Sequence, residues 1–305
     1  MPAIHNPETM RLKRRAAWLS VALTGSSVVV KGLIALATGS SAVLAETAHS
    51  FSDLLAAVIA LIAVRAADRP ADPSHPFGHQ KLEHVSAVIE GLLLILVAGF
   101  VAVHAARSFG APVENSGLGI VVMMASAGAS FFVARRISRV AKQSHSAALE
   151  ADSAHIAADV WSSLATAAAL GIVAITGWVE VDAIFAIAVS GWIAATGARL
   201  ARNGVRVLID ESVPQTDLEA IREALDESRP AGVISYHRLR ARRSGATRHI
   251  DVHVVVDPGM TVGEAHRITD QIEASVEARL PSADVVVHVE PAGSKPEPDA
   301  MLGAD

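Results

Sequence analysis

Two short stretches of the sequence carry the same pair of metal-ligand side chains in apolar surroundings. His49 and Asp53 lie in "AETAHSFSDLL", and His155 and Asp159 lie in "ADSAHIAADVW". Within each pair the residues are four apart, so on a helix both side chains share one face. Two imidazole nitrogens and two carboxylate oxygens make a full tetrahedral ligand set for zinc. The two stretches together predict a metal site built from two helices.

The cost of placing these side chains in lipid supports the same interpretation. An ionisable side chain at the centre of a bilayer costs roughly 2.5 to 3.5 kcal/mol on insertion scales. A dication between two carboxylates neutralises them, and the imidazoles bind it in their neutral form. The alternative is that each pair is a hydrogen bond on a helix surface near the end of a span. The match between two separate spans favours the metal site.

The elements that must position these residues are apolar segments of membrane-spanning length. Six segments of about 20 residues each could cross a bilayer. They are residues 16–38, 43–64, 83–106, 117–134, 153–176 and 180–200. Fourteen Lys and Arg residues lie before the first segment, in the second–third and fourth–fifth connections, and at the end of the sixth segment (Arg199, Arg202 and Arg206), whereas the other connections carry only Arg107. This bias predicts that both termini are cytoplasmic.

Composition agrees with a membrane protein that has a soluble part. Of 305 residues, 51% are hydrophobic, and the mean hydropathy is +0.39, which is high for a soluble protein. The net charge of −5 argues against a nucleic-acid partner. Cysteine is absent and 13 histidines are present, so any metal must be bound by His, Asp or Glu. No phosphate-binding GxxxxGK[ST] motif occurs, and the chain is expected to be a transporter rather than an enzyme.

From about residue 207 the pattern is that of a soluble domain. "TDLEAIREALDES" reads as an amphipathic helix, and "GVISYHRLRARRS" and "TRHIDVHVVVD" alternate like strands. A second helix and the strand "DVVVHVE" follow. The order α-β-β-α-β predicts a ferredoxin-like α+β domain. The expected division is a six-span α-helical membrane domain at 1–206, the α+β domain at 207–291 and a disordered tail at 292–305.

Six spans, the repeated "HxxxD" and the α-β-β-α-β domain give the chain a resemblance to the cation diffusion facilitators, which export zinc and related divalent metals. The resemblance covers nearly the whole chain. It implies a transport site at His49, Asp53, His155 and Asp159, in the combination associated with zinc and cadmium. The chemistry of the residues agrees, because two imidazoles make the site softer and better suited to Zn²⁺ than to Mn²⁺ or Mg²⁺.

The connection between the second and third segments holds a further ligand set. Asp72, His75 and His79 lie in "ADPSHPFGHQKLEH". Their spacing allows one metal ion to be bound, although loops of this kind also carry histidines without a ligand role. The family resemblance implies a zinc ion here.

Histidines of the soluble domain fall on separate predicted strands. His237, His253 and His288 each lie on a strand, and His266 lies on the second helix. The resemblance places metal ligands at these four positions and an acidic ligand at Glu290. Taken singly, each histidine could equally be an exposed surface residue.

These features predict an integral, multi-pass membrane protein of the bacterial inner membrane that exchanges divalent metal for protons. Zn²⁺ is the expected cargo, with Cd²⁺, Co²⁺ and Fe²⁺ left open. The expected partners are metal ions, protons, membrane lipid and a second copy of the chain, joined as a homodimer through the soluble domain. One alternative is a membrane-bound sensor or scaffold that binds zinc without moving it. Another is an exporter of a different substrate in which the buried residues relay protons.

Overall fold

The computed structural model describes residues 7–38, 41–107, 109–110, 116–227 and 232–293. The chain divides into two compact units, one formed by Pro7–Leu208 and the other beginning at Ile209. The tail expected at 292–305 lies outside the described residues from position 294 onward.

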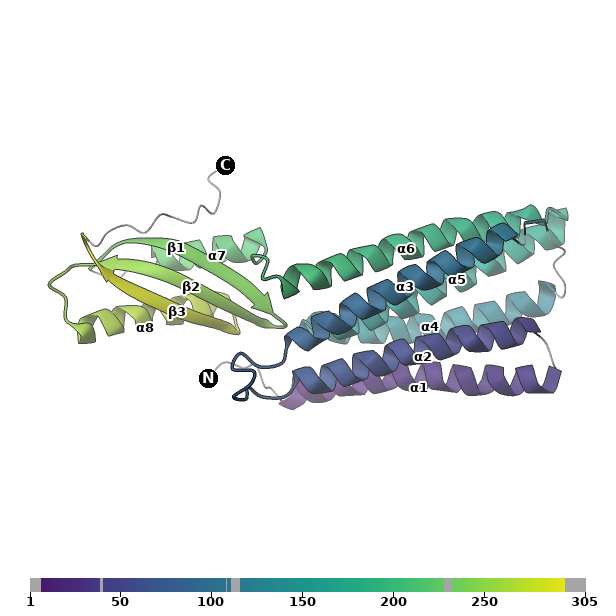
Figure 1. The fold of residues 1–305 in the computed structure, drawn as a ribbon, viewed down its shortest axis with the longest axis horizontal. Helices are drawn as coiled ribbons and strands as arrows, with labels where there is room; N and C mark the ends of the chain where they lie inside the picture. The colour runs from purple at the N-terminus through teal and green to yellow at the C-terminus, as the bar shows by residue number, and fades with distance from the viewer. Residues whose placement is uncertain (1–6, 39–40, 108, 111–115, 228–231, 294–305) are drawn as a thin grey trace. The chain divides into compact units, whose positions relative to one another are not determined.

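The first unit consists, in its described part, of six long helices whose successive members run in opposite directions (Figure 1). They are α1 (Pro7–Thr38), α2 (Ser41–Ala67), α3 (Lys81–Arg107), α4 (Ser116–Ser144), α5 (Ala147–Thr176) and α6 (Glu180–Leu208). At about 1.5 Å per residue, each is longer than the hydrocarbon core of a bilayer is thick. The predicted order of elements is confirmed.

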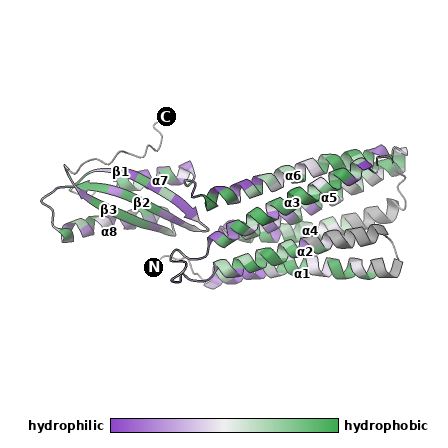
Figure 2. Cartoon of the chain, viewed as in Figure 1, coloured by the Kyte–Doolittle hydropathy of each residue, from purple (hydrophilic) through white to green (hydrophobic). Residues whose placement is uncertain are grey.

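Three helices are long and apolar enough to cross a membrane when only the described residues are considered. They are Lys81–Arg107, Ala147–Val173 and Ala183–Leu208. Figure 2 shows hydrophobic residues along α3 and hydrophilic ones where α6 ends. Several helices extend past the apolar segments seen in the sequence. The apolar pattern predicts a fourth segment at 117–134, for example, whereas α4 continues to Ser144. Backbone hydrogen bonds do not require apolar side chains, so a helix can extend beyond the apolar segment.

Glycines set the distance between α3 and α6. A Cβ added at Gly91 would lie 2.6 Å from the carbonyl oxygen of Gly197, and one added at Gly197 would lie 2.6 Å from that of Gly91. A Cβ at Gly204 would lie 2.9 Å from the His84 carbonyl oxygen. The two backbones therefore pack at a separation that only small residues allow, as is typical of helices in membranes.

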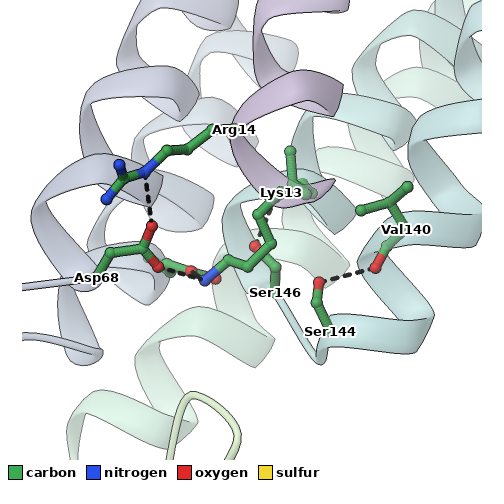
Figure 3. Close-up of polar contacts among 8 residues, drawn as sticks. Lys13, Arg14, Asp68, Val140, Ser144 and Ser146 are labelled. Atoms are coloured by element: carbon green, nitrogen blue, oxygen red, sulfur yellow. Dashed lines mark hydrogen bonds and ion pairs between the residues drawn. The ribbon is translucent and has the colours of Figure 1, made fainter. Parts of the chain in front are cut away.

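An ion cluster joins the ends of α1, α2 and α3. Lys13 Nζ lies 3.4 Å from Asp68 Oδ1 and also pairs with Glu83, while Arg14 Nε lies 3.0 Å from Asp68 Oδ2 (Figure 3). The side chains of Asp68 and Glu83 are each 4% exposed, and that of Lys13 is 12% exposed. The cluster is therefore largely removed from water, where a missing partner is costly.

The second unit is an α+β domain, as expected. It contains α7 (Gln215–Glu227), β1 (Val233–Ser244), β2 (Thr247–Val256), α8 (Val262–Arg279) and β3 (Ala283–Pro291). In the described residues the sheet has the order β1-β2-β3, with β1 antiparallel and β3 parallel to β2. Helix α8 begins at a capping box formed by Thr261 and Glu264.

One face of this sheet is covered by the two helices. Ile250, Val252 and Val254 of β2 are buried in one core with Ile221 of α7 and Ile272 of α8. Because side chains alternate along a strand, the residues between them on β2 point to the opposite face. That opposite face carries the histidines.

Lys13→Met tests the ion cluster. Removing the ammonium leaves the buried Glu83 carboxylate uncompensated, so unfolding free energy should fall by about 3 kcal/mol or more. A thermal melt of the purified protein in detergent measures the loss. Adding Glu83→Gln to Lys13→Met should restore much of the stability, because the unpaired charge is then gone. Equal melting temperatures for Lys13→Met and the parent would contradict this role.

Candidate metal centres

The first cluster lies inside the helical unit. His155 of α5 is 4% exposed and Asp53 of α2 is 8% exposed. His155 Nε2 lies 3.1 Å from Asp53 Oδ1. Asp53, His155 and Asp159 can each offer one ligand atom, with all three atoms within 4.8 Å of one another. Two helices thus bring one imidazole and two carboxylates together, and of these His155 and Asp53 are buried and Asp159 is partly buried.

Several alanines of α2 and α5 are buried in the helical unit. Ala56, Ala57 and Ala60 of α2 are buried, as are Ala151 and Ala158 of α5. Alanine at these positions permits close backbone contact. His155 and Asp159 are four residues apart and share one face of α5, and Asp53 of α2 contacts His155.

His49 is the fourth ligand expected at this site. The structure places His49 on α2, four residues before Asp53, but does not describe its side chain. Its role as a ligand stays a prediction.

Two further buried carboxylates were missed in the sequence. Glu90 of α3 is fully buried and Asp152 of α5 is 2% exposed. Ser86 donates a 2.7 Å hydrogen bond to Glu90, and Ser20 donates a 2.8 Å bond to Asp152. The signal that could have found Glu90 is the acidic residue within the apolar run "AVIEGLLL".

The second cluster lies in the connection between α2 and α3. Asp72 Oδ1 lies 3.3 Å from His75 Nδ1, and Asp72 Oδ2 lies 3.4 Å from His79 Nε2. A short bridge pairs Asp72 with His75, and the loop turns at Gly78, whose φ is 80°. All three ligand atoms fall within 4.8 Å of one another.

Hydrogen bonds keep the Asp72 carboxylate ionised. The hydroxyl of Ser74 donates to Oδ1 at 2.6 Å, and the backbone N–H of His75 donates to the same oxygen at 2.8 Å. The Ser74 side chain first, and then the His75 backbone, lower the pKa of Asp72 well below its usual range. An ionised carboxylate is the form that binds a metal.

The third cluster lies on the open face of the sheet. The register pairs His237 of β1 with His253 of β2, and His253 with His288 of β3. The ring centroids of His237 and His253 are 5.3 Å apart, and those of His253 and His288 are 4.6 Å apart. The three imidazoles therefore form a row across the strands.

Glu290 joins this row from β3. Its Oε1 accepts a 2.7 Å hydrogen bond from His253 Nδ1 and lies 3.6 Å from His288 Nε2, and its Oε2 lies 3.5 Å from His237 Nε2. The His253 hydrogen bond, followed by the nearby histidine charges, lowers the pKa of Glu290. His237, His253 and Glu290 offer ligand atoms within 4.8 Å of one another.

A β-bulge in β1 turns His237 toward this face. The register shifts between His237 and Arg240, and Arg238 has a φ of 50°. Tyr236 packs against the core before the bulge, and Leu239 is buried in it afterwards. One extra residue reverses the alternation. On a regular strand, residues two apart face the same side. Without the extra residue, His237 would therefore face the core, as Leu239 does.

His266 does not join the row in this chain. It lies on α8, with its side chain 75% exposed and its Nε2 3.9 Å from Asp270 Oδ1. Helix α8 packs its Ile268 and Ile272 on the covered face of the sheet, whereas the other histidines lie on the open face. Its predicted ligand role rests on the family resemblance alone.

A helical membrane unit with buried ligands, followed by a small α+β domain, is the architecture of a cation-efflux transporter. Residues 17–209 match the family model of the cation efflux transmembrane domain, and residues 213–292 match that of the cation efflux protein cytoplasmic domain. Together the two matches span both compact units.

Relatives of similar length agree. The chain is 33% identical over 287 residues to an uncharacterised transporter of Synechocystis sp., covering 93% of this chain and 92% of the relative. It is 30% identical over 297 residues to the cation-efflux pump FieF of Serratia proteamaculans, covering 95% and 97%. Among solved structures, the metal-bound C-terminal domain of the CzcD transporter from Thermotoga maritima is 34% identical, over 27% of this chain and 96% of that chain, with a TM-score of 0.24.

The chain belongs to the cation diffusion facilitator, or cation efflux, family. It is a membrane protein of a family that moves divalent metal ions.

Substitution of Arg238 tests the bulge. Glycine adopts positive φ freely, whereas valine is strained there. Arg238→Gly should keep the stability of the domain, and Arg238→Val should lower it by about 1–2 kcal/mol. Chemical denaturation of both variants measures the difference. Equal stability of the two variants would mean that the bulge does not depend on residue 238.

Zinc-dependent stability tests the row of histidines. A fragment of residues 209–293 retains the whole core of the second unit. At free zinc about 100-fold above its dissociation constant, binding should stabilise this fragment by about 2.7 kcal/mol. Replacing His253 and His288 by Ala should remove most of this increment in thermal melts. His249→Ala is the matched control, since His249 also lies on β2 but pairs with Asp284 at 2.9 Å. An undiminished increment in the double variant would exclude these two histidines as ligands.

Proposed function

We propose that this protein exports Zn²⁺ from the cytoplasm in exchange for protons, with Asp53, His155, Asp159 and His49 as the transport ligands. The observation that carries the proposal is the cluster of the buried Asp53 and His155 with the partly buried Asp159, whose potential ligand atoms lie within 4.8 Å of one another. Mixed imidazole and carboxylate donors suit zinc and cadmium better than magnesium. The cluster would have no use in a sensor that binds metal only at exposed sites.

Competition for the same atoms supports exchange with protons. His155 Nε2 and Asp53 Oδ1 lie 3.1 Å apart, so a proton between them occupies lone pairs that a metal ion would need. Metal binds only the deprotonated forms of these groups. A site that carries metal in one direction and protons in the other therefore acts as an antiporter.

The charge bias of the connections supports a cytoplasmic location for both termini and for the α+β domain. The relatives named FieF are bacterial cation-efflux pumps, which supports a bacterial inner membrane. The open sheet face, with His237, His253 and Glu290, supports a second metal site at which two copies of the chain would associate as a homodimer. Metal there would change transport only if it binds one conformation better than the other.

Asp159→Asn tests the transport site. The substitution keeps the shape of the side chain and removes one of the charges that balance the dication, so zinc flux should fall to background. The assay uses proteoliposomes with a zinc-sensitive and a pH-sensitive dye inside. Zinc movement in the parent should be accompanied by proton movement in the opposite direction.

Glu150→Gln is the matched control, because Glu150 lies on the same helix and is exposed; its flux should equal that of the parent. Parent-like flux in Asp159→Asn would remove the site assignment. Zinc flux without proton counter-flux at every gradient would leave a transporter but exclude antiport.

A further inference from the structure

We propose that the last turns of α4 form a docking surface for an anionic phospholipid, with two phenylalanines against its acyl chains and four basic side chains at its headgroup. The four basic side chains, called the basic arc here, are Arg135, Arg136, Arg139 and Lys142. The proposal concerns the surface of the helical unit and does not depend on which ion is transported.

The basic arc occupies one side of α4. Successive residues of an α-helix are about 100° apart, so the four side chains fall within an arc of about 120°, and all four are exposed. The opposite side of the helix is buried. Its side chains belong to one core with residues of α5, and this core includes Ile137, Val140, Ala141, Leu149 and Ile156. The basic arc therefore faces away from the packed side of α4.

The charges of the basic arc are not neutralised by carboxylates within the described part of the chain. None of its side chains has an ion pair or hydrogen bond there, and the sequence has no Asp or Glu between Glu114 and Glu150. The basic residues at the start of α1 differ, because Lys13 and Arg14 both pair with Asp68. Like charges three or four residues apart on a helix repel one another. An external anion would relieve this repulsion.

Two aromatic side chains lie one turn before the basic arc. Phe131 is 47% exposed and Phe132 is 73% exposed, and their ring centroids are 5.8 Å apart in an edge-to-face arrangement. They lie near the end of the apolar segment 117–134, and Phe132 precedes Arg136 by about 6 Å along the helix axis. Apolar rings beside the hydrocarbon and cations just beyond it match the two parts of a lipid molecule.

The chemistry of the basic arc selects a headgroup with net negative charge. Arg135 and Arg139 are four residues apart, which places their Cβ atoms about 5–6 Å from each other, so both guanidinium groups can reach one phosphate. Each guanidinium can donate two parallel N–H bonds to phosphate oxygens. A zwitterionic headgroup brings an ammonium group that the same arginines repel. Clusters of Lys and Arg just beyond a membrane-spanning helix attract anionic lipids.

A lipid at this surface would act on the helix that carries two of the proposed transport ligands. Helices α4 and α5 share a buried core, and Ile156 in that core is the neighbour of His155 in the chain. A lipid that binds the folded helices and not the unfolded chain stabilises them by mass action. Anionic lipid should therefore stabilise the pair formed by α4 and α5.

The competing explanation is that the basic arc only sets the orientation of α4 during insertion and is otherwise solvated. Lipid binding to the purified protein separates the two. The experiment uses the full-length protein in a nonionic detergent. Native mass spectrometry gives dissociation constants for phosphatidylglycerol and for phosphatidylethanolamine with the same acyl chains. Thermal melts compare stabilisation by phosphatidylglycerol with stabilisation by inorganic phosphate.

The parent should bind phosphatidylglycerol more tightly than phosphatidylethanolamine. At roughly 1 kcal/mol for each cation near an anionic surface, the double variant Arg135→Gln, Arg139→Gln should bind phosphatidylglycerol about 25-fold more weakly than the parent. The matched control is Arg222→Gln, Arg267→Gln, which removes two exposed arginines of the α+β domain and should leave the dissociation constant unchanged.

A pair of single variants covers the case in which the double variant aggregates on gel filtration. Arg139→Gln should then weaken phosphatidylglycerol binding by about fivefold. Arg139→Lys should weaken it less, because the charge is kept and only the paired N–H donors are lost.

Three results would overturn the proposal. They are equal dissociation constants of the parent for the two lipids, unchanged binding of phosphatidylglycerol by the folded glutamine variants, and stabilisation by inorganic phosphate equal to that by phosphatidylglycerol. The last result would reassign the basic arc to a free anion. Zinc flux enters none of these measurements, so the lipid surface and the proposed export are tested separately.

Discussion

Charge buried among apolar helices is the constraint on which the rest of the first unit depends. Asp53, Glu90 and Asp152 are each 8% exposed or less, in a place where an isolated carboxylate would be far less stable than in water. Hydroxyl groups from Ser20 and Ser86 stabilise two of them, and His155 lies against the third. The stability of the bundle therefore depends on these contacts.

Helix packing serves this arrangement. Glycines at 91 and 197 bring α3 against α6, and Ala158 of α5 packs with Leu94 and Ala98 of α3. Small residues contribute little hydrophobic surface, but in lipid that surface is not what drives association. The ion cluster of Lys13, Asp68 and Glu83 supplies specific contacts between helix ends instead.

The three ligand clusters use similar side chains in different surroundings. Asp53 and His155 are buried, the Asp72 loop is exposed, and the row on the sheet is half-buried. In water a metal competes with solvent for its ligands, whereas inside the bundle the uncompensated ligands are themselves unfavourable. The buried cluster should therefore depend most strongly on being occupied by either metal or protons. The exposed clusters can stay empty at little cost.

Features that depend on local spacing can be predicted from the order of the residues alone. The "HxxxD" pairs share helix faces because α-helical geometry has a fixed period, and the α-β-β-α-β order follows from hydrophobic patterns that each segment carries alone. Contacts between groups far apart in the chain follow from the packing of whole helices and strands. The meeting of Asp53 with His155 depends on how α2 packs beside α5, and the position of His237 depends on an extra residue at Arg238 that reverses the strand alternation. His266 and His253 share a residue type, but the sheet separates α8 from the open face. Local sequence patterns do not predict these contacts, because each contact depends on packing between segments far apart in the chain.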